Sequence, residues 1–259
     1  MCIRDRSYSL HYSSDRVAGS TSANAVAVTD ALQLGGWTLS VHHAFDPSLQ
    51  TYCVGGACSP PSSEPKALFL GDGTTRSDAK IQAPVQAGGN YYLTSQNGRE
   101  VYVFNSKGQH LQTLRPMTGA VAYTFGYDAA GSLISVTDAA GNVTKIDRDP
   151  SEHPLDIVAP FGQKTTLAVD ANGYLSRIAD PAGNQVILTN GTSGLLTRMT
   201  DANGGVFTFQ YDSSGLLLHD NDPVGGSINL SRTTTNGNYT VTKTSALQRT
   251  CLLYTSRCV

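Results

Sequence analysis

The stretch GYDAAGSLISVTDAAGN, Gly126 to Asn142, contains Asp-Ala-Ala-Gly twice, at 128–131 and again at 138–141. An Asp at the first position of a reversal accepts hydrogen bonds from the backbone two residues further on, and a Gly at the fourth supplies the positive φ that closes a hairpin. The residues between the two copies are rich in Leu, Ile, Val and Thr, which favour a strand. The stretch therefore predicts two successive turns of an antiparallel β-meander.

The same turn recurs along the chain. Its glycine falls at positions 131, 141, 162, 173, 183, 204, 215 and 225. Degenerate copies fill the gaps: Gly194 closes a copy whose Asp is replaced by Gly191, and Glu152 stands where a glycine is expected. The spacing alternates between 10 and 11 residues, so two units give a 21-residue period, the kind of repeat that dominates a fold.

Large apolar residues follow the same period and confirm it independently of the turns. The columns are Phe104, Phe125, Ile146, Leu167, Leu188, Phe209 and Leu230; then Leu133, Pro154, Leu175, Leu196 and Leu217; then Val136, Ile157, Ile178 and Met199, which Asp220 interrupts. A mixed column, Tyr127, Arg148, Val169, Asn190, Tyr211 and Arg232, is expected on a less buried face. Residues 21 apart occupy equivalent places two strands over, so the columns predict apolar stripes on one face of a sheet.

The composition limits the class of protein. Of the 259 residues only 15% are charged and the net charge is −2, which excludes the basic patch of a nucleic-acid-binding protein and the attraction of an anionic membrane. No apolar run reaches the roughly 18 to 20 residues of a membrane-spanning helix. The 26 glycines suit many turns, and helix is disfavoured throughout.

The N-terminal third is less regular but rich in strand signals. Tyr8 to Gly19 predicts a strand leading into a turn, and Leu34 to Pro47 predicts a strand with Trp37, Leu39 and Val41 on one side. Lys66 to Arg76 predicts strand, Gly-Asp-Gly turn and strand. The stretch 53–65 between them predicts a loop, because Pro60 and Pro61 exclude regular structure. Further reversals are expected near Gly98, Gly108 and Gly119.

The repeat resembles that of the Rhs and YD-repeat proteins, in which a Tyr-Asp-x-x-Gly turn alternates with a Thr-Asp-x-x-Gly turn. Tyr127-Asp128 and Tyr211-Asp212 match this signature, and 158–175 is similar to the family's degenerate copies. Segments 9–19, 34–47 and 68–73 resemble stretches found ahead of the repeats in large Rhs-type and teneurin-like proteins. The resemblance implies an antiparallel strip wound into a hollow shell, which in bacterial relatives encloses a C-terminal toxic domain released by autoproteolysis.

The fold expected is therefore all-β: an antiparallel β-meander strip of YD-repeat hairpins, as a partial, open β-shell, with a less regular β-rich N-terminal segment. The chain has about six double repeats, too few to close a shell, and shows neither a C-terminal protease region nor a toxin. The organism, the toxin cargo and the delivery system are not indicated.

The two ends of the chain differ from the rest. A DNA sequence encoding residues 1–6, MCIRDR, has a reverse complement that encodes Cys-Leu-Leu-Tyr-Thr in another frame, and these are residues 251–255. Such inverted repeats resemble transposon ends used in preparing sequencing libraries. We expect residues 1–6 and 251–259 to be artefactual scars, with a pre-repeat segment at 7–80 and the Rhs/YD-repeat strip at 81–250.

No residue pattern predicts catalytic, cofactor-binding or metal-binding residues, and we expect no enzyme. The turn aspartates carry too few acids per turn for a calcium-binding β-roll. The histidines are His11, His42, His43, His110, His153 and His219; the adjacent pair would point to opposite faces of a strand, and the others are scattered. Ser193 lacks the first spacer of a nucleophile elbow, and Gly71-Asp72-Gly73 is too short for a phosphate loop. Between Cys53 and Cys58, a disulfide and two free thiols are equally open.

The resulting hypothesis is a structural shell fragment of a secreted or surface-displayed bacterial protein. Its partners would be the remainder of its own shell and an enclosed C-terminal toxin domain, with no nucleic acid and no membrane span. The alternative is a β module that binds carbohydrates or cell surfaces through exposed tyrosines. The candidates are Tyr91, Tyr92, Tyr102, Tyr123, Tyr127, Tyr174, Tyr211 and Tyr239.

Overall fold

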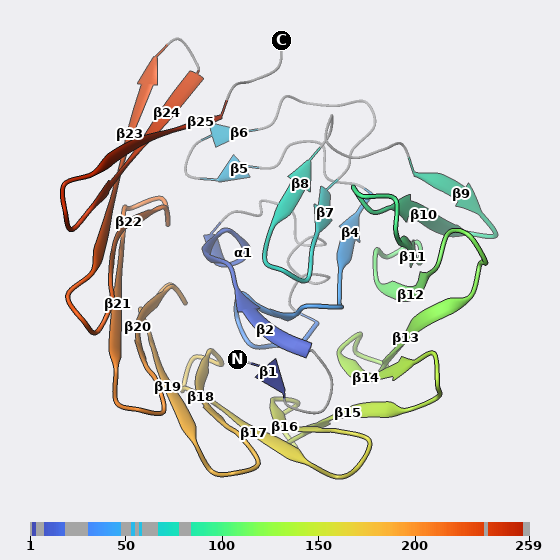
Figure 1. Ribbon diagram of the computed structural model, residues 1–259. Coiled ribbons are helices and arrows are strands. Elements are labelled where there is room, and N and C mark those ends of the chain that lie inside the picture. Colours follow the sequence, from blue (N-terminus) through green and yellow to red (C-terminus); the bar gives the residue numbers. More distant parts are fainter. Residues whose placement is uncertain are drawn as a thin grey trace.

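The computed structural model describes residues 2–3, 8–18, 31–47, 53–54, 57–58, 67–77, 84–235 and 238–255. Two parts can be distinguished in it. The first is the N-terminal segment, which we define as the described residues of 2–77. The second is the strip, residues 84–255, which curls around the N-terminal segment (Figure 1).

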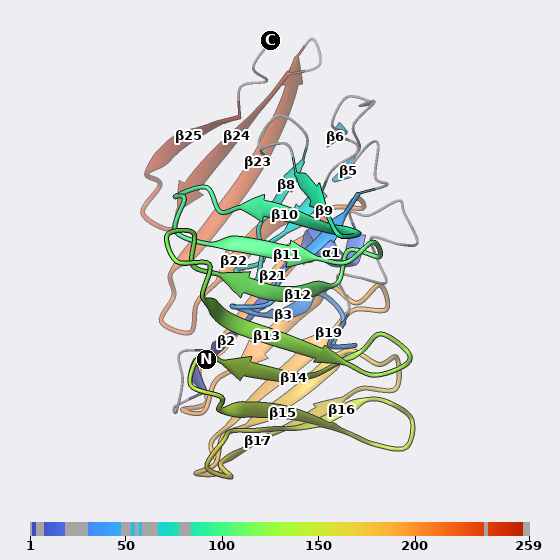
Figure 2. The ribbon, with the colours of Figure 1, turned by 90° about the vertical axis from the view of Figure 1, so that its right-hand side faces the viewer.

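The strip is one antiparallel sheet in which each strand pairs with its neighbours in the sequence. Its strands are β9 Val85–Ala87, β10 Asn90–Thr94, β11 Val101–Phe104, β12 His110–Leu114, β13 Val121–Tyr127, β14 Leu133–Asp138, β15 Val143–Arg148, β16 Pro154–Val158, β17 Lys164–Val169, β18 Leu175–Ala179, β19 Gln185–Asn190, β20 Leu196–Thr200, β21 Val206–Tyr211, β22 Leu217–Asn221, β23 Ser227–Thr235, β24 Asn238–Ser245 and β25 Thr250–Thr255. Figure 2 shows the strands stacked side by side. Among the described pairings none joins β25 to β9, so the curled sheet is open. The expected all-β meander is confirmed.

The turns have the geometry that the repeat predicts. The φ angles of the repeat glycines run from +80° at Gly215 to +93° at Gly131, and Glu152 adopts +67° in the place of a glycine. Asp138 Oδ1 accepts hydrogen bonds from the backbone N–H groups of Ala140, at 3.0 Å, and Asn142, at 2.8 Å. The aspartates at 149, 170, 180, 201, 212 and 222 accept the same pair of bonds, and Asp128 accepts from Ser132 N–H alone, so the carboxylates hold these turns closed.

The apolar columns are cross-strand partners. Phe125 lies opposite Val136, and the same pairing recurs one period later between Ile146 and Ile157. Each such hairpin carries a register shift one residue before the mixed column, as between Gly126 and Tyr127. The bulges recur with the 21-residue period because each double repeat contains one of them.

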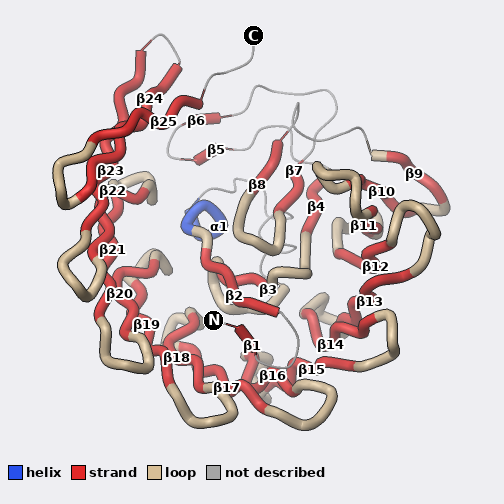
Figure 3. Tube along the Cα trace, viewed as in Figure 1, coloured by secondary structure: helices blue, strands red, loops and turns tan. Residues whose placement is uncertain are grey.

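The N-terminal segment is built from short elements. They are β1 Cys2–Ile3, β2 Tyr8–Tyr12, α1 Ser14–Ala18, β3 Trp37–Leu39, β4 Ala44–Asp46, β5 Cys53–Val54, β6 Ala57–Cys58, β7 Ala67–Phe69 and β8 Thr75–Ser77. They form the sheets β1-β2-β3, β4-β7-β8 and β5-β6. Figure 3 shows these elements enclosed by the strands of the strip.

Three details differ from the sequence-based expectation. Helix was expected nowhere, yet α1 follows β2, and its five residues are too few to produce a periodic pattern. The strand at Trp37 ends at Leu39, so Val41 lies in a turn, although it still packs against the main core. The stretch 53–65 was expected to be a loop, yet its first residues form the paired strands β5 and β6, with Cys53 opposite Cys58. The side chains of these cysteines, and with them the question of a disulfide, lie outside the described residues.

Parts of both expected scars are strands. Cys2–Ile3 pairs with β2, and β25 pairs with β24. Strand pairing uses backbone groups and does not reveal where a sequence came from. The division of the chain into scars, pre-repeat segment and strip stays a prediction.

The main hydrophobic core lies between the N-terminal segment and the concave face of the strip. It joins Tyr8, Leu10, Ala31, Leu32, Leu34, Trp37 and Leu39 to the apolar columns from Phe125 to Leu196. Burial along the first column is nearly complete from Phe125 to Leu188, at 1% to 5% exposure, whereas Phe209 is only partly buried. The inner face of the strip is thus covered by the chain's own N-terminal segment over β13 to β20.

Candidate functional site

The seam, which we define as the contact between the N-terminal segment and the strip, uses backbone groups left free by the bulges. Leu133 N–H, at the start of β14, donates to Ala31 O at 2.8 Å. Three periods further on, Leu196 N–H at the start of β20 donates to the Tyr12 hydroxyl at 2.9 Å. The second apolar column therefore contributes both its buried side chains and its amides to the seam.

The mixed column satisfies the carbonyls at the same positions. Arg148 Nη2 donates to Leu133 O at 3.1 Å and the Tyr211 hydroxyl donates to Leu196 O at 2.9 Å. Arg148 also reaches across the seam, because Nη2 donates to Ala31 O at 3.2 Å and Nη1 donates to Gln33 Oε1 at 2.8 Å. The residues of the mixed column are partly buried, as expected, and four of them donate to a backbone carbonyl: Tyr127, Arg148, Asn190 and Tyr211.

Tyr174 fixes the position of the N-terminal segment at β18. A Cβ atom added at Gly35 would lie 2.4 Å from Tyr174 Cδ1, and one added at Gly194 would lie 2.5 Å from Tyr174 Cε1. Both glycines have positive φ. The tyrosine ring therefore contacts two backbones, one from each part, that only glycine allows so close.

Three buried histidines meet at the other end of the seam, and we call them the histidine cluster. His42 and His43 lie between β3 and β4, and His110 begins β12; they are 3%, 8% and 0% exposed. His43 N–H donates to His110 Nδ1 at 3.2 Å, and the His110 ring stacks on Phe125 with centroids 4.1 Å apart. The expectation that His110 is scattered from the adjacent pair is wrong, as is the expectation that the pair sits on a strand.

The hydrogen bonds assign the tautomers of the cluster. His110 Nδ1 accepts from His43 N–H and His43 Nδ1 accepts from Gly71 N–H at 2.9 Å, so both rings are neutral with the proton on Nε2. The Tyr127 hydroxyl donates to His110 O at 3.0 Å, so His42 Nε2–H donates to that hydroxyl at 2.9 Å. A second proton on His43 or His110 would displace a backbone donor.

Burial keeps the cluster neutral. Loss of hydration, with the neighbouring histidine and Arg16 as smaller causes, lowers the pKa of His42 from 6.5 to about 3. The pKa of His43 is likewise lowered to about 3 by burial, against the opposing attraction of Asp72. Burial and the two other rings place the pKa of His110 well below its ordinary value.

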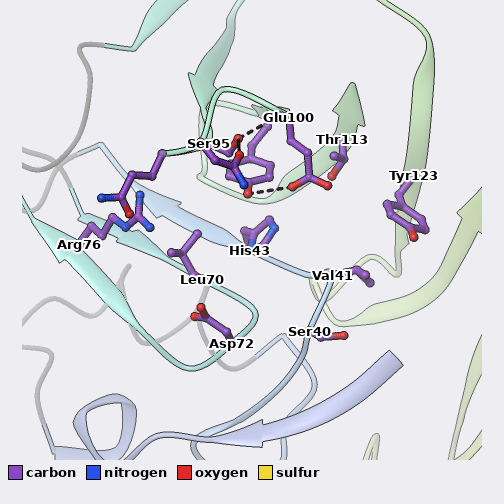
Figure 4. Close-up of a pocket in the computed structure, with 13 residues that line it drawn as sticks. Ser40, Val41, His43, Leu70, Asp72, Arg76, Ser95, Glu100, Thr113 and Tyr123 are labelled. Atoms are coloured by element: carbon purple, nitrogen blue, oxygen red, sulfur yellow. Dashed lines mark hydrogen bonds between the residues drawn. The ribbon is translucent and has the colours of Figure 1, made fainter. Parts of the chain in front are cut away.

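A cavity of about 470 Å³ lies beside the cluster, between the N-terminal segment and strands β10 to β13. Figure 4 shows His43 between Leu70 and Asp72 of the N-terminal segment and Glu100 of the strip. The strip lines the cavity with the turn between β10 and β11. In this turn Asn97 Oδ1 accepts from Ser95 Oγ at 2.9 Å and from Arg99 N–H at 3.0 Å.

The acids and tyrosines of the cavity are held in place. The Tyr102 hydroxyl donates to Glu100 Oε2 at 3.0 Å, and burial followed by this carboxylate raises the pKa of Tyr102. Asp72 Oδ1 accepts from Thr74 N–H at 2.9 Å and from Thr74 Oγ1 at 2.7 Å. Partial burial opposes ionisation of Asp72, but the bonds from Thr74 outweigh it and lower the pKa.

The remaining sequence candidates lie elsewhere or in structural roles. Ser193 lies in the turn before β20, and Gly71 to Gly73 form the turn between β7 and β8. His153 and His219 stand apart from the cluster, on the turn before β16 and on β22. In the described part of the chain no group of three or more His, Cys, Asp and Glu could hold a metal ion.

The tyrosines proposed for glycan binding do not form an exposed row. Of the candidates, Tyr102 is buried, and Tyr91, Tyr92, Tyr123, Tyr127, Tyr174 and Tyr211 are partly buried. Tyr127 and Tyr211 donate to backbone carbonyls of the strip. The side chain of Tyr239 lies outside the described residues.

Sequence reasoning missed the histidine cluster and the cavity. The only local signal was the adjacent pair His42-His43, which says nothing about His110, 67 residues away from His43. Both features are made by contacts between the N-terminal segment and the strip. The fold and the seam together define a protein whose Tyr-Asp repeats build a curled, open β-shell.

Comparison with known proteins agrees with this class. The model of the Teneurin YD-shell family matches residues 88–255. Teneurin-3 of Danio rerio is 35% identical over 106 residues, which are 41% of this chain and 4% of that protein. Teneurin-1 of Mus musculus is 36% identical over 108 residues, 42% of this chain and 4% of that protein. The chain belongs to the Teneurin YD-shell family, and it spans a small part of the length of these relatives.

A solved structure gives a weaker likeness. The crystal structure of TcdB2-TccC3 without its hypervariable C-terminal region aligns with a TM-score of 0.32 and 13% identity, covering 74% of this chain and 12% of that one. At this level the match indicates nothing about function. No helix among the described residues is long and apolar enough to cross a membrane.

Proposed function

We propose that this chain forms part of the wall of a secreted or surface-displayed YD-repeat shell and has no enzymatic activity of its own. The observation that carries the proposal is the unbroken antiparallel sheet from β9 to β25, which curls around a core shared with the N-terminal segment. Its residues make turns, stripes and seam contacts. A wall needs these features and no catalytic group.

The complete protein, in this proposal, encloses a C-terminal toxin domain supplied by sequence outside these residues. The support for this step is the resemblance of the repeats to those of bacterial Rhs proteins. Since the N-terminal segment covers the inner face over β13 to β20, an enclosed domain would contact that segment or the strands beyond β20. Phe209 and Leu230, on those strands, are only partly buried.

Limited proteolysis of the longer natural protein tests enclosure. The C-terminal region should resist protease while the wall is intact, and it should become cleavable in a Leu167→Asp variant, because Leu167 is 1% exposed in the core. Gln163→Ala, on an exposed turn of the same hairpin, is the control that keeps the wall. Equal digestion of the C-terminal region in all three proteins contradicts enclosure.

The longer gene provides a second test. A repeat run that continues past Thr250 toward a variable terminal domain supports the shell that encloses a toxin. A different domain following the repeats directly contradicts it. Glycan binding through outward tyrosines, the alternative function, gains no support from the partly buried positions of those side chains.

A further inference from the structure

The backbone amides of the second apolar column form a repeated contact with the N-terminal segment. The contacts join Leu133 N–H to Ala31 O at 2.8 Å, Leu175 N–H to Leu34 O at 3.4 Å and Leu196 N–H to the Tyr12 hydroxyl at 2.9 Å. Pro154 occupies the same place on β16 and has no N–H group to satisfy. Every donor of this column from β14 to β20 is therefore met by the chain that covers the inner face.

Leu217 is the next member of the column, and its N–H group is not met in this way. It lies opposite Tyr211 across the same kind of bulge. Asp212 N–H donates to Leu216 O at 2.9 Å beside this pair, so Leu217 N–H points away from β21. The described pairing of β22 with β23 stops at His219. Within the described part of the chain, Leu217 N–H has no acceptor.

Asp220 is the second open group on the inner face beyond β20. The third apolar column ends there, because a carboxylate takes the place that Ile178 and Met199 occupy in the preceding repeats. Asp220 lies directly opposite Phe209 of β21 and Ile228 of β23, so its side chain projects to the same face as theirs. Among the described residues, none forms a hydrogen bond or an ion pair with this carboxylate.

We define the open inner face as Phe209, Leu217, Asp220, Ile228 and Leu230. It continues the face that the main core covers, because Phe209 still packs against that core while the other four lie outside it. All five residues are partly buried. Figure 1 shows β21 to β23 extending the curl of the strip past β20. The same sheet face therefore passes without a break from a covered part to an open part.

The open groups specify the chemistry of what can cover this face. Leu217 N–H calls for a carbonyl or hydroxyl oxygen, since backbone donors without a partner are rare away from water. Asp220 calls for a lysine or arginine, because hydrogen bonds between charged groups are the strong ones. Phe209 and Leu230 call for apolar side chains. An extended stretch of polypeptide supplies all three, as the irregular stretch 31–36 does over β14 and β18.

We propose that a further segment of the same polypeptide, from outside residues 1–259, lies along the open inner face. A backbone oxygen of this segment accepts from Leu217 N–H, and its lysine or arginine pairs with Asp220. The segment belongs to the same molecule because the neighbouring amides of the column are covered by their own chain, and a tether raises the effective concentration of the segment. The inference rests on the proposed wall function, since it assigns a covering to the inner face of that wall.

Photochemical cross-linking in the longer natural protein tests this contact. Benzoylphenylalanine in place of Leu230 should cross-link on illumination to a peptide from outside residues 1–259 that contains a lysine or arginine, which mass spectrometry identifies. The same photoreactive residue in place of Leu218, which is 41% exposed on the opposite face of β22, is the control and should not reach that peptide.

A charge reversal tests the pairing with Asp220. Asp220→Lys should lower the cross-linking yield from position 230 about ten-fold, because it removes the ion pair and introduces repulsion between like charges. Asp147→Lys, on the exposed side of β15, is the matched control and should leave the yield unchanged.

Hydrogen exchange gives an independent readout. Leu217 N–H should exchange at least about ten-fold more slowly in the longer protein than in the 259-residue chain, whereas Leu133 N–H and Leu196 N–H should be equally slow in both. The proposal is overturned if Leu217 exchanges equally in the two proteins, if position 230 cross-links only within residues 1–259 or not at all, or if Asp220→Lys keeps the full yield. If it fails while the C-terminal region still resists protease, the wall function stands.

Discussion

Acidification should open the seam through the histidine cluster. His42, His43 and His110 are neutral in the folded chain, and their pKa values lie below the ordinary 6.5. The unfolded chain therefore binds protons first as the pH falls. The contribution of these histidines to the free energy of unfolding is fully present above pH 6.5. It is lost progressively as the pH falls from 6.5 toward about 3, the pKa of His42 and His43 in the folded chain.

The loss is large enough to measure. At pH 5, about 1.5 pH units below the ordinary histidine value, a buried neutral histidine lowers the free energy of unfolding by about 2 kcal/mol. His42 and His43 together give about 4 kcal/mol, and His110 acts in the same direction. A domain of ordinary stability has only about 5 to 15 kcal/mol in total.

The charged neighbours of His43 act on its pKa in both directions, since Asp72 raises it and Arg16 and Arg76 lower it. The carboxylates with lowered pKa values, Asp72, Asp149 and Asp180, contribute stability that is lost only below pH 3.8.

The assay is urea unfolding at several pH values between 7.5 and 5, followed by the fluorescence of Trp37. This is the single tryptophan of the chain, it is 8% exposed in the seam, and its ring lies 5.4 Å from that of Tyr12. Opening of the seam exposes the indole to water and shifts its emission to longer wavelength. The midpoint should fall steeply below pH 6.5.

A double variant, His42→Gln with His43→Asn, isolates the cause. The new amides can keep the donor to Tyr127 and the acceptor for Gly71 without gaining a proton. The variant loses stability at neutral pH, but its further loss on acidification should be about 4 kcal/mol smaller. His219→Gln, on β22, is the control that keeps the full acid loss. A wild-type change below about 1 kcal/mol, or an equal acid loss in the double variant, refutes the reasoning.

Three further perturbations test the seam and the turns by urea unfolding. Gly35→Ala should lower the free energy of unfolding by about 2 to 4 kcal/mol, because the new Cβ meets Tyr174 and φ is positive. Gly141→Ala, also at positive φ but with no atom within 4 Å, should lower it by only about 1 to 2 kcal/mol. Equal losses would show that the clash with Tyr174 contributes nothing. Arg148→Met should cost about 2 to 4 kcal/mol through its lost bonds across the seam, and a change below 1 would contradict them. Asp201→Ala should cost about 1 kcal/mol and Asp201→Asn less, since the amide oxygen can still accept from the turn; an equal cost would contradict this.

The strip could be predicted from the sequence because its causes are local. An Asp and a Gly three positions apart fix one turn, and the apolar columns repeat with the same 21-residue period. Glu152, which stands where the repeat places a glycine, has the positive φ of such a glycine. The pairing of Phe125 with Val136 follows from the turn between them. Register in a hairpin is set by its own loop.

The seam, the histidine cluster and the cavity could not be predicted in this way. Tyr12 reaches Leu196 across 184 residues, and His43 reaches His110 across 67. No periodic pattern in the N-terminal segment specifies which strands it meets. Local sequence patterns therefore specify a sheet of hairpins with one apolar face, whereas long-range contacts specify what covers that face. The hydrophobic effect is non-directional, so many apolar surfaces could have covered it.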